Sequence, residues 1–167
     1  MTELAPGWPL VVEETTENHC VAVCGDVVLI FAREGSYADV QHVETGSRVL
    51  HRVARLRKGK TRVLFVLPEV NARAPSAAVR DAMLDVAKRL ADRVSKGSLV
   101  LPGPGFGSAI HRGVMTGIFA LARPEAQVKV TSDLREGLVH LLGEGEPVLG
   151  PLLRFCEETR RGGLPTR

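Results

Sequence analysis

The stretch CVAVCGDVVLIFA, residues 20–32, decides the fold of this chain. Residues 20–24 alternate small and branched apolar side chains, as a β-strand does, and residues 27–32 form a second, continuously apolar run. Gly25 and Asp26 lie between the two runs and are residue types that form tight turns. The stretch therefore predicts an antiparallel β-hairpin, which we expect at or near an edge of the sheet.

Strands and helices alternate after this hairpin. Apolar runs at residues 63–67, 99–101 and 127–130 predict three more strands, and the segments between them show helical spacing of apolar residues. A fourth helix follows the last strand, where Asp133 and Glu136 form a capping box. The order ββαβαβαβα predicts an α/β protein with a mixed, mostly parallel five-stranded sheet and helices packed on it.

Serine N-caps predict where the three connecting helices begin. These serines are Ser36, Ser76 and Ser108. The apolar stripe of the second helix includes Val94, and Gly97 is predicted to end that helix. Gly46 and Ser47 lie on the apolar stripe of the first helix, which predicts close packing of that helix on the sheet.

Length and composition predict one domain with flanking segments. The chain has 167 residues, of which 44% are hydrophobic, enough to fill a single core. Residues 1–19 are rich in proline and acidic residues and are predicted to form an extended N-terminal arm. Residues 20–142 are predicted to form the α/β domain, and residues 143–167 an added helix at 148–159 followed by a basic tail.

Charge and aromatic content argue against nucleic acid as a partner. Only 4% of residues are aromatic and the net charge is +3, so a stacking surface for bases is not expected. Residues 52–62 nevertheless carry six cations, which could bind an acidic partner or could complement the exposed carbonyls at a helix C-terminus. We also expect a cytoplasmic protein without membrane insertion, because no leader pattern or long apolar run is present.

The three cysteines are interpreted as buried free thiols. Cys20 and Cys24 lie about 13 Å apart on one strand and cannot form a disulfide with each other, and Cys156 lies far along the chain. The five histidines are scattered without ligand spacing, so we expect no metal site and no cofactor.

A glycine-rich loop at residues 102–108 is the most conspicuous local signal. Gly103, Gly105, Phe106, Gly107 and Ser108 lead from a strand into a helix, where backbone N–H groups can bind an anion. The alternative is a plain sharp turn, with Phe106 folded back as a hydrophobic plug.

Two residues just inside the third helix extend this candidate site. His111 and Arg112 follow the loop, and Arg112 is the better candidate to hold an anion or the carboxylate of a partner. Gly113 and Gly117, farther along the helix, could admit another helix, although packing within the chain explains such pairs more often.

Ser76 is the candidate phosphoacceptor or partner-binding residue. A phosphate at the start of a helix is favoured by the helix dipole and changes the local charge, whereas the alternative is a plain N-cap. No serine, cysteine or acid pair forms a catalytic constellation, so we predict no catalytic residues.

The element order, the helix-opening serine and the Pro-Gly loop together resemble the STAS-like domain of bacterial anti-sigma-factor antagonists. The resemblance covers residues 20–142, and the segment APSAA at 74–78 aligns Ser76 with the serine that a partner kinase phosphorylates in that family. The segment Gly105-Phe106-Gly107 with a downstream arginine is closer to the SpoIIAA-like members.

The resemblance implies a non-enzymatic cytoplasmic regulatory or adaptor module that acts through another protein. We expect the loop at residues 68–76, the start of the second helix and residues 102–112 to form the contact surface. The alternative is a binder of a small anionic ligand, a nucleotide, acyl-phosphate or lipid, at the loop 102–108. A weak homodimer is also predicted, with the added C-terminal helix covering either its own domain or a neighbouring copy.

Overall fold

The computed structural model describes residues 2–16, 19–32, 40–56, 60–68, 76–103, 106–122 and 127–161. The strands in these ranges are β1 (Thr2–Ala5), β2 (Trp8–Thr15), β3 (His19–Cys24), β4 (Val27–Ala32), β5 (Thr61–Val66), β6 (Val94–Val100) and β7 (Gln127–Thr131). The helices are α1 (Val40–Leu56), α2 (Ala77–Leu90), α3 (Phe106–Ala122), α4 (Leu134–Leu142) and α5 (Leu149–Arg160).

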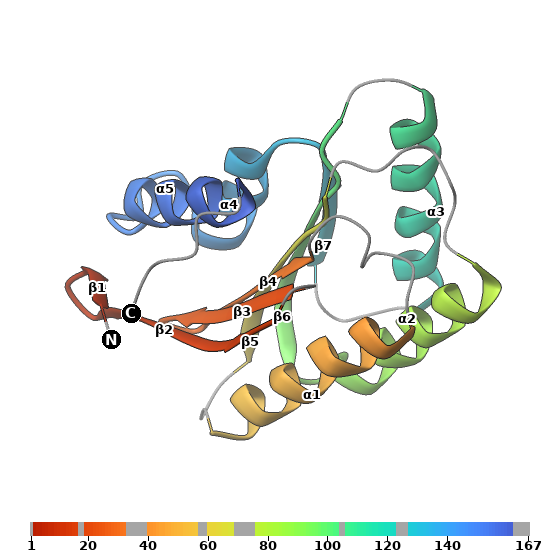
Figure 1. The fold of residues 1–167 in the computed structure, drawn as a ribbon, viewed down its shortest axis with the longest axis horizontal. Coiled ribbons are helices and arrows are strands. Elements are labelled where there is room, and N and C mark those ends of the chain that lie inside the picture. Colours follow the sequence, from red (N-terminus) through yellow and green to blue (C-terminus); the bar gives the residue numbers. More distant parts are fainter. Residues whose placement is uncertain are drawn as a thin grey trace.

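The described residues form one mixed sheet in which the spatial order of the strands follows the chain, β1 to β7 (Figure 1). Pairs from β1 to β4 are antiparallel and pairs from β4 to β7 are parallel. The predicted α/β class and mixed sheet are confirmed. The predicted five strands are wrong, because the sheet has seven, and its six strand pairs divide evenly between antiparallel and parallel.

The two additional strands come from the segment that we expected to be an extended arm. Leu10 of β2 lies opposite Cys24 of β3 and is buried, while Glu13 on the same strand is exposed. Pro9 and the acidic residues hid this strand signal, but pairing with β1 and β3 satisfies the backbone polar groups. The predicted hairpin, β3 and β4, is confirmed, but it lies inside the sheet and not at an edge.

Topology determines which face each helix covers. Right-handed crossovers between consecutive parallel strands place α1, α2 and α3 together on one face of the sheet. The helices α4 and α5 lie on the opposite face (Figure 1). Leu64 and Val66 of β5 point toward α4 and α5, and Val63 and Phe65 point the other way.

The face under α4 and α5 is densely packed. Gly137 of α4 lies so close to the sheet that a Cβ there would be 2.9 Å from Val100 Cγ2. In α5, Leu152 is fully buried and Phe155 stacks edge-on against Phe31, with the ring centroids 6.2 Å apart. The C-terminal helix therefore covers its own domain, one of the two arrangements that we expected.

Some predicted helix boundaries differ from the structure. Val94 and Gly97 lie in β6 and not in the second helix, because β6 pairs with β5 from Val94 onward. Ser108 lies inside α3, which begins at Phe106, so it does not cap that helix. The Asp133 cap is confirmed, since its carboxylate accepts from the Glu136 N–H at 2.7 Å, and Ser36 lies outside the described residues.

Candidate binding site

Ser76 caps α2 as the sequence predicts. Its hydroxyl oxygen accepts a hydrogen bond from the Val79 N–H at 3.3 Å, and the residue is exposed. The cap explains why a serine stands at this position. The residue lies on the surface, at the end of the sheet where the parallel strands have their carboxyl ends.

The glycine-rich loop is described only in part. Gly103 has a φ of +110°, a backbone conformation that glycine adopts readily and other residues rarely do. Gly105 lies outside the described residues. Phe106, Gly107, Ser108 and His111 lie in the first two turns of α3, and the plug expected of the Phe106 side chain lies outside the described side chains.

Arg112 contacts the start of the same loop. Its Nη1 donates a hydrogen bond to the Leu101 carbonyl oxygen at 3.4 Å, and the residue is half-buried. This contact holds the guanidinium group between α3 and the end of β6. The candidate residues Gly103 and Arg112 therefore lie on adjoining elements, with α2 and its Ser76 cap packed beside α3.

The outer face of α3 is exposed, and its described side chains carry no charge. The exposed residues of this face are Ala109, Ile110, Gly113, Thr116, Gly117 and Ala120. The Ile110 side chain is 44% exposed, and a Cβ at Gly113 or Gly117 would meet no atom within 4 Å. Packing within the chain therefore does not explain the two glycines, contrary to our expectation. We call these six residues the α3 face.

Two cations of the basic segment already have partners. Arg52 donates to a Glu13 carboxylate oxygen at 2.9 Å, and Arg62 forms a bidentate pair with Asp26. Arg55 lies in the last turn of α1, where a cation complements the helix dipole. Arg55 fits the predicted alternative of a cation at a helix C-terminus, and Arg52 and Arg62 pair with acidic side chains of the same chain.

The cysteines lie on the other side of the sheet and form no reactive centre. Cys20, Cys24 and Cys156 are free and buried in the core beneath α4 and α5. Burial raises the pKa of the Cys156 thiol far above its ordinary range, with Cys24 adding to the shift. Among the described residues, no three His, Cys, Asp or Glu side chains gather as metal ligands.

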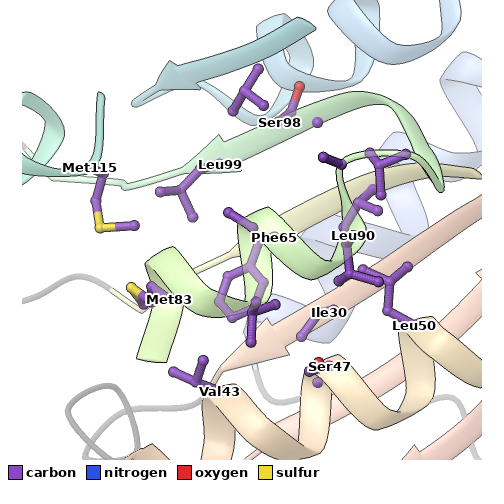
Figure 2. Close-up of a pocket in the computed structure, with 18 residues that line it drawn as sticks. Ile30, Val43, Ser47, Leu50, Phe65, Met83, Leu90, Ser98, Leu99 and Met115 are labelled. Atoms are coloured by element: carbon purple, nitrogen blue, oxygen red, sulfur yellow. The ribbon is translucent and has the colours of Figure 1, made fainter. Parts of the chain in front are cut away.

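An apolar pocket between the sheet and helices α1–α3 was not predicted. It has a volume of about 150 Å³ and is partly open, with Phe65, Met83 and Met115 among its walls (Figure 2). Gly46 and Ser47 border this pocket, and a Cβ at Gly46 would lie 3.6 Å from Ile30 Cδ1, so α1 packs closely on the sheet at Gly46 as expected. Ala87 and Gly97 are further small residues in its lining, but no local sequence pattern shows that their elements face α1.

Comparison of the chain with protein-family models, curated proteins and solved structures gave no match. Within the described ranges, every helix is too short or too polar to cross a membrane. The STAS-like resemblance stays a prediction.

Proposed function

We propose that this chain is a non-enzymatic regulatory module of the STAS-like kind that acts by binding another protein. The contact surface consists of the α3 face together with Ser76 and Arg112, which lie at the carboxyl ends of the parallel strands. The observation that carries the proposal is the absence of charge from the described side chains of the α3 face, which runs from Ala109 to Ala120, about three helical turns.

The chemistry of the α3 face fits the centre of a protein interface. Charged residues are depleted at interface cores, and an exposed isoleucine surrounded by small side chains gives a flat apolar patch. Gly113 and Gly117 allow a partner to approach the helix backbone closely, because no side chain projects there. We propose an apolar helix of another protein as the occupant.

Ser76 supplies a means of regulation in this proposal. It lies at the exposed start of α2, and α2 packs beside α3. A phosphate there would add nearly two negative charges beside the uncharged α3 face. These charges would weaken the binding of an apolar partner.

A charge placed on the α3 face tests the proposal. The partner is first co-purified with the wild-type protein and then prepared in pure form. Thr116→Glu is expected to weaken binding of this pure partner by at least about tenfold in calorimetry. Thr2→Glu, at an exposed position of β1, is the matched control and is expected to leave the affinity unchanged. Equal affinities for both variants would overturn the proposed surface.

Light scattering separates the proposed partner from self-association. If the wild-type protein is a dimer and Thr116→Glu a monomer, the α3 face binds a second copy and the proposal of a different protein is wrong.

The second candidate is an anion binder at the loop 102–108. The position of Arg112, whose guanidinium group contacts the Leu101 carbonyl, favours this candidate. Thermal shift with ATP, acetyl phosphate and a lipid phosphate tests it, because a ligand of the native state raises Tm. An increase that is lost in Arg112→Gln supports anion binding, and an unchanged Tm with all three contradicts it.

A further inference from the structure

The pocket between the sheet and helices α1–α3 has walls of hydrocarbon and thioether groups. Its lining comes from four neighbouring strands and three helices, so every element on this face of the sheet contributes. Among its described lining residues, only Ser47 and Ser98 carry a polar side chain. The Ser98 hydroxyl donates to the Gly137 carbonyl oxygen at 2.8 Å, on the other face of the sheet, and so does not serve the pocket.

Such a wall selects an uncharged, apolar occupant. A polar group inside the pocket would lose its hydrogen bonds with water, and among the described lining side chains only the Ser47 hydroxyl could replace them. Apolar cavities of about 150 Å³ in other proteins stay dry and take up small hydrocarbons. Water is therefore a poor occupant, and a hydrocarbon a good one.

The shape of the pocket favours a flexible chain over a rigid ring. Its lining runs from Met83 to Ala91 along α2, about 12 Å at the helical rise. Across the sheet it runs from Ile30 on β4 to Val128 on β7, about 14 Å at the usual strand spacing. The lining of this pocket, which we call the slot, therefore extends farther in both directions than a single ring does, so a flexible chain can contact more of it.

The wall itself is adaptable. Met83 and Met115 project into the slot from α2 and α3 (Figure 2), and methionine side chains are flexible and adjust to the shape of an apolar neighbour. Val63, Phe65 and Val86 are only half-buried, so ligand atoms would complete their burial.

We propose that this pocket binds an unbranched hydrocarbon chain, either a free alcohol or fatty acid or the tail of a larger lipid. The chain lies between the sheet and α1–α3, and any polar head group remains in water. The pocket is on the inner side of these helices, whereas the proposed protein-binding surface uses the outer side of α3. A test of one proposal therefore does not decide the other.

Two alcohols with the same number of carbon atoms test the proposal on the full-length protein. Decan-1-ol is an unbranched chain, and adamantan-1-ol is a compact rigid cage. Decan-1-ol is expected to raise Tm with increasing concentration and adamantan-1-ol to leave it unchanged. Decanoic acid is expected to act like decan-1-ol, and a response to the acid alone would show that the charged head group provides the binding.

Filling the pocket provides the structural control. Ala87→Phe places a ring inside the slot and is expected to weaken decan-1-ol binding by at least about tenfold. Ala78→Phe makes the same change at an exposed position of the same helix and is expected to bind as the wild type does. Ala91→Leu, at the other end of the α2 wall, replaces Ala87→Phe if circular dichroism shows that variant to be unfolded.

The outcomes divide cleanly. Binding of decan-1-ol that is lost with a filled pocket and kept in Ala78→Phe supports the proposal. No increase in Tm for the wild type, or equal affinity of the filled-pocket and control variants, overturns it. Equal binding of the two alcohols overturns the assignment of an unbranched chain.

Discussion

At the scale of single residues, the Arg62 side chain connects three separate parts of the molecule. Its guanidinium group pairs with Asp26 in the β3–β4 turn and donates to the Leu141 carbonyl of α4 at 3.1 Å. The same group lies 5.4 Å from the centre of the Trp8 ring, a cation–π distance. One side chain of β5 thus holds β2, the hairpin and α4 together.

Arg62→Ala is expected to lower the free energy of unfolding by about 2–3 kcal/mol, because half-buried hydrogen bonds to a charged group are lost. Arg89→Ala, which removes only the exposed pair with Asp85, is expected to cost about 0.5 kcal/mol or less. Urea unfolding of the two variants measures the difference. Similar midpoints would show that Arg62 contributes no more than a surface ion pair does.

At the scale of elements, the β3–β4 hairpin depends on a glycine with positive φ. Gly25 has a φ of +56°, and a Cβ there would lie 2.4 Å from Trp8 Cε3. Gly7 has a φ of +79° with no atom near its missing Cβ.

Gly7→Ala is expected to cost about 1–2 kcal/mol from backbone strain alone. Gly25→Ala is expected to cost at least about 1 kcal/mol more, because the Trp8 ring must also move. Thermal unfolding compares the two. Equal losses would mean that the ring shifts at no cost.

The contacts of Glu136 in α4 with Lys129 and Thr131 in β7 predict that the stability of the fold depends on pH. Hydrogen bonds to Glu136 from Lys129, at 2.7 Å, and from Thr131 lower the pKa of Glu136 below its ordinary value of 4.5. The folded state therefore favours the carboxylate, and the resulting stabilisation is present above pH 4.5 and is lost as the pH falls through the lowered pKa.

Glu136→Gln is accordingly expected to lower Tm at pH 7 and to have a decreasing effect as the pH falls below 4.5. Glu144→Gln, which alters the exposed pair with Arg135, is the control and is expected to change Tm little at either pH. A Tm difference for Glu136→Gln that stays constant with pH would contradict this account.

Local patterns predicted the elements that local interactions define. The bounds of β4 follow from a continuous apolar run, and the cap at Asp133 follows from one side-chain hydrogen bond. Val94 and Gly97 were misassigned because their strand depends on pairing with β5 and β7, which no local pattern reveals. Glu136 was expected to complete a capping box, but its carboxylate binds Lys129 and Thr131, partners on the neighbouring strand.

The candidate site was predictable to the same extent. Ser76 and Arg112 could be located because a cap and a loop are local features. The pocket could not be, because Ile30, Leu50 and Val128 lie far apart in sequence and meet only across the sheet. The exposure of Gly113 and Gly117 likewise depends on how α3 is oriented in the folded chain.

At the scale of the whole molecule, the two faces of the sheet are packed differently. The α4–α5 face has Gly137 against the sheet, whereas the other face has a partly open apolar pocket of about 150 Å³. The dense face thus stabilises the fold, while the opposite face keeps an unfilled pocket. The burial of α5 on one face thus supplies stability, and the other face keeps the pocket for which we propose binding of a hydrocarbon chain.

The packing of α5 gives the last prediction. Leu152 is fully buried against the core, and its neighbour Leu153 is only half-buried. Leu152→Ala is expected to lower the free energy of unfolding by about 2–5 kcal/mol, and Leu153→Ala by about 1 kcal/mol. Truncation after Gly145 removes the helix and is expected to cause aggregation in light scattering, because it exposes the core beneath it.

The two alanine substitutions should leave the oligomeric state of the folded protein unaltered, since α5 covers its own domain and the α3 face lies on the other side of the sheet. Leu152→Ala is expected to change stability and not the oligomeric state, and Thr116→Glu to weaken binding of the partner and not to change stability. Urea unfolding of both variants, light scattering of Leu152→Ala, and calorimetry of Thr116→Glu with the partner test this separation. A folded, monodisperse truncated protein would show that the dense face does not depend on α5 and would contradict the role assigned to Leu152.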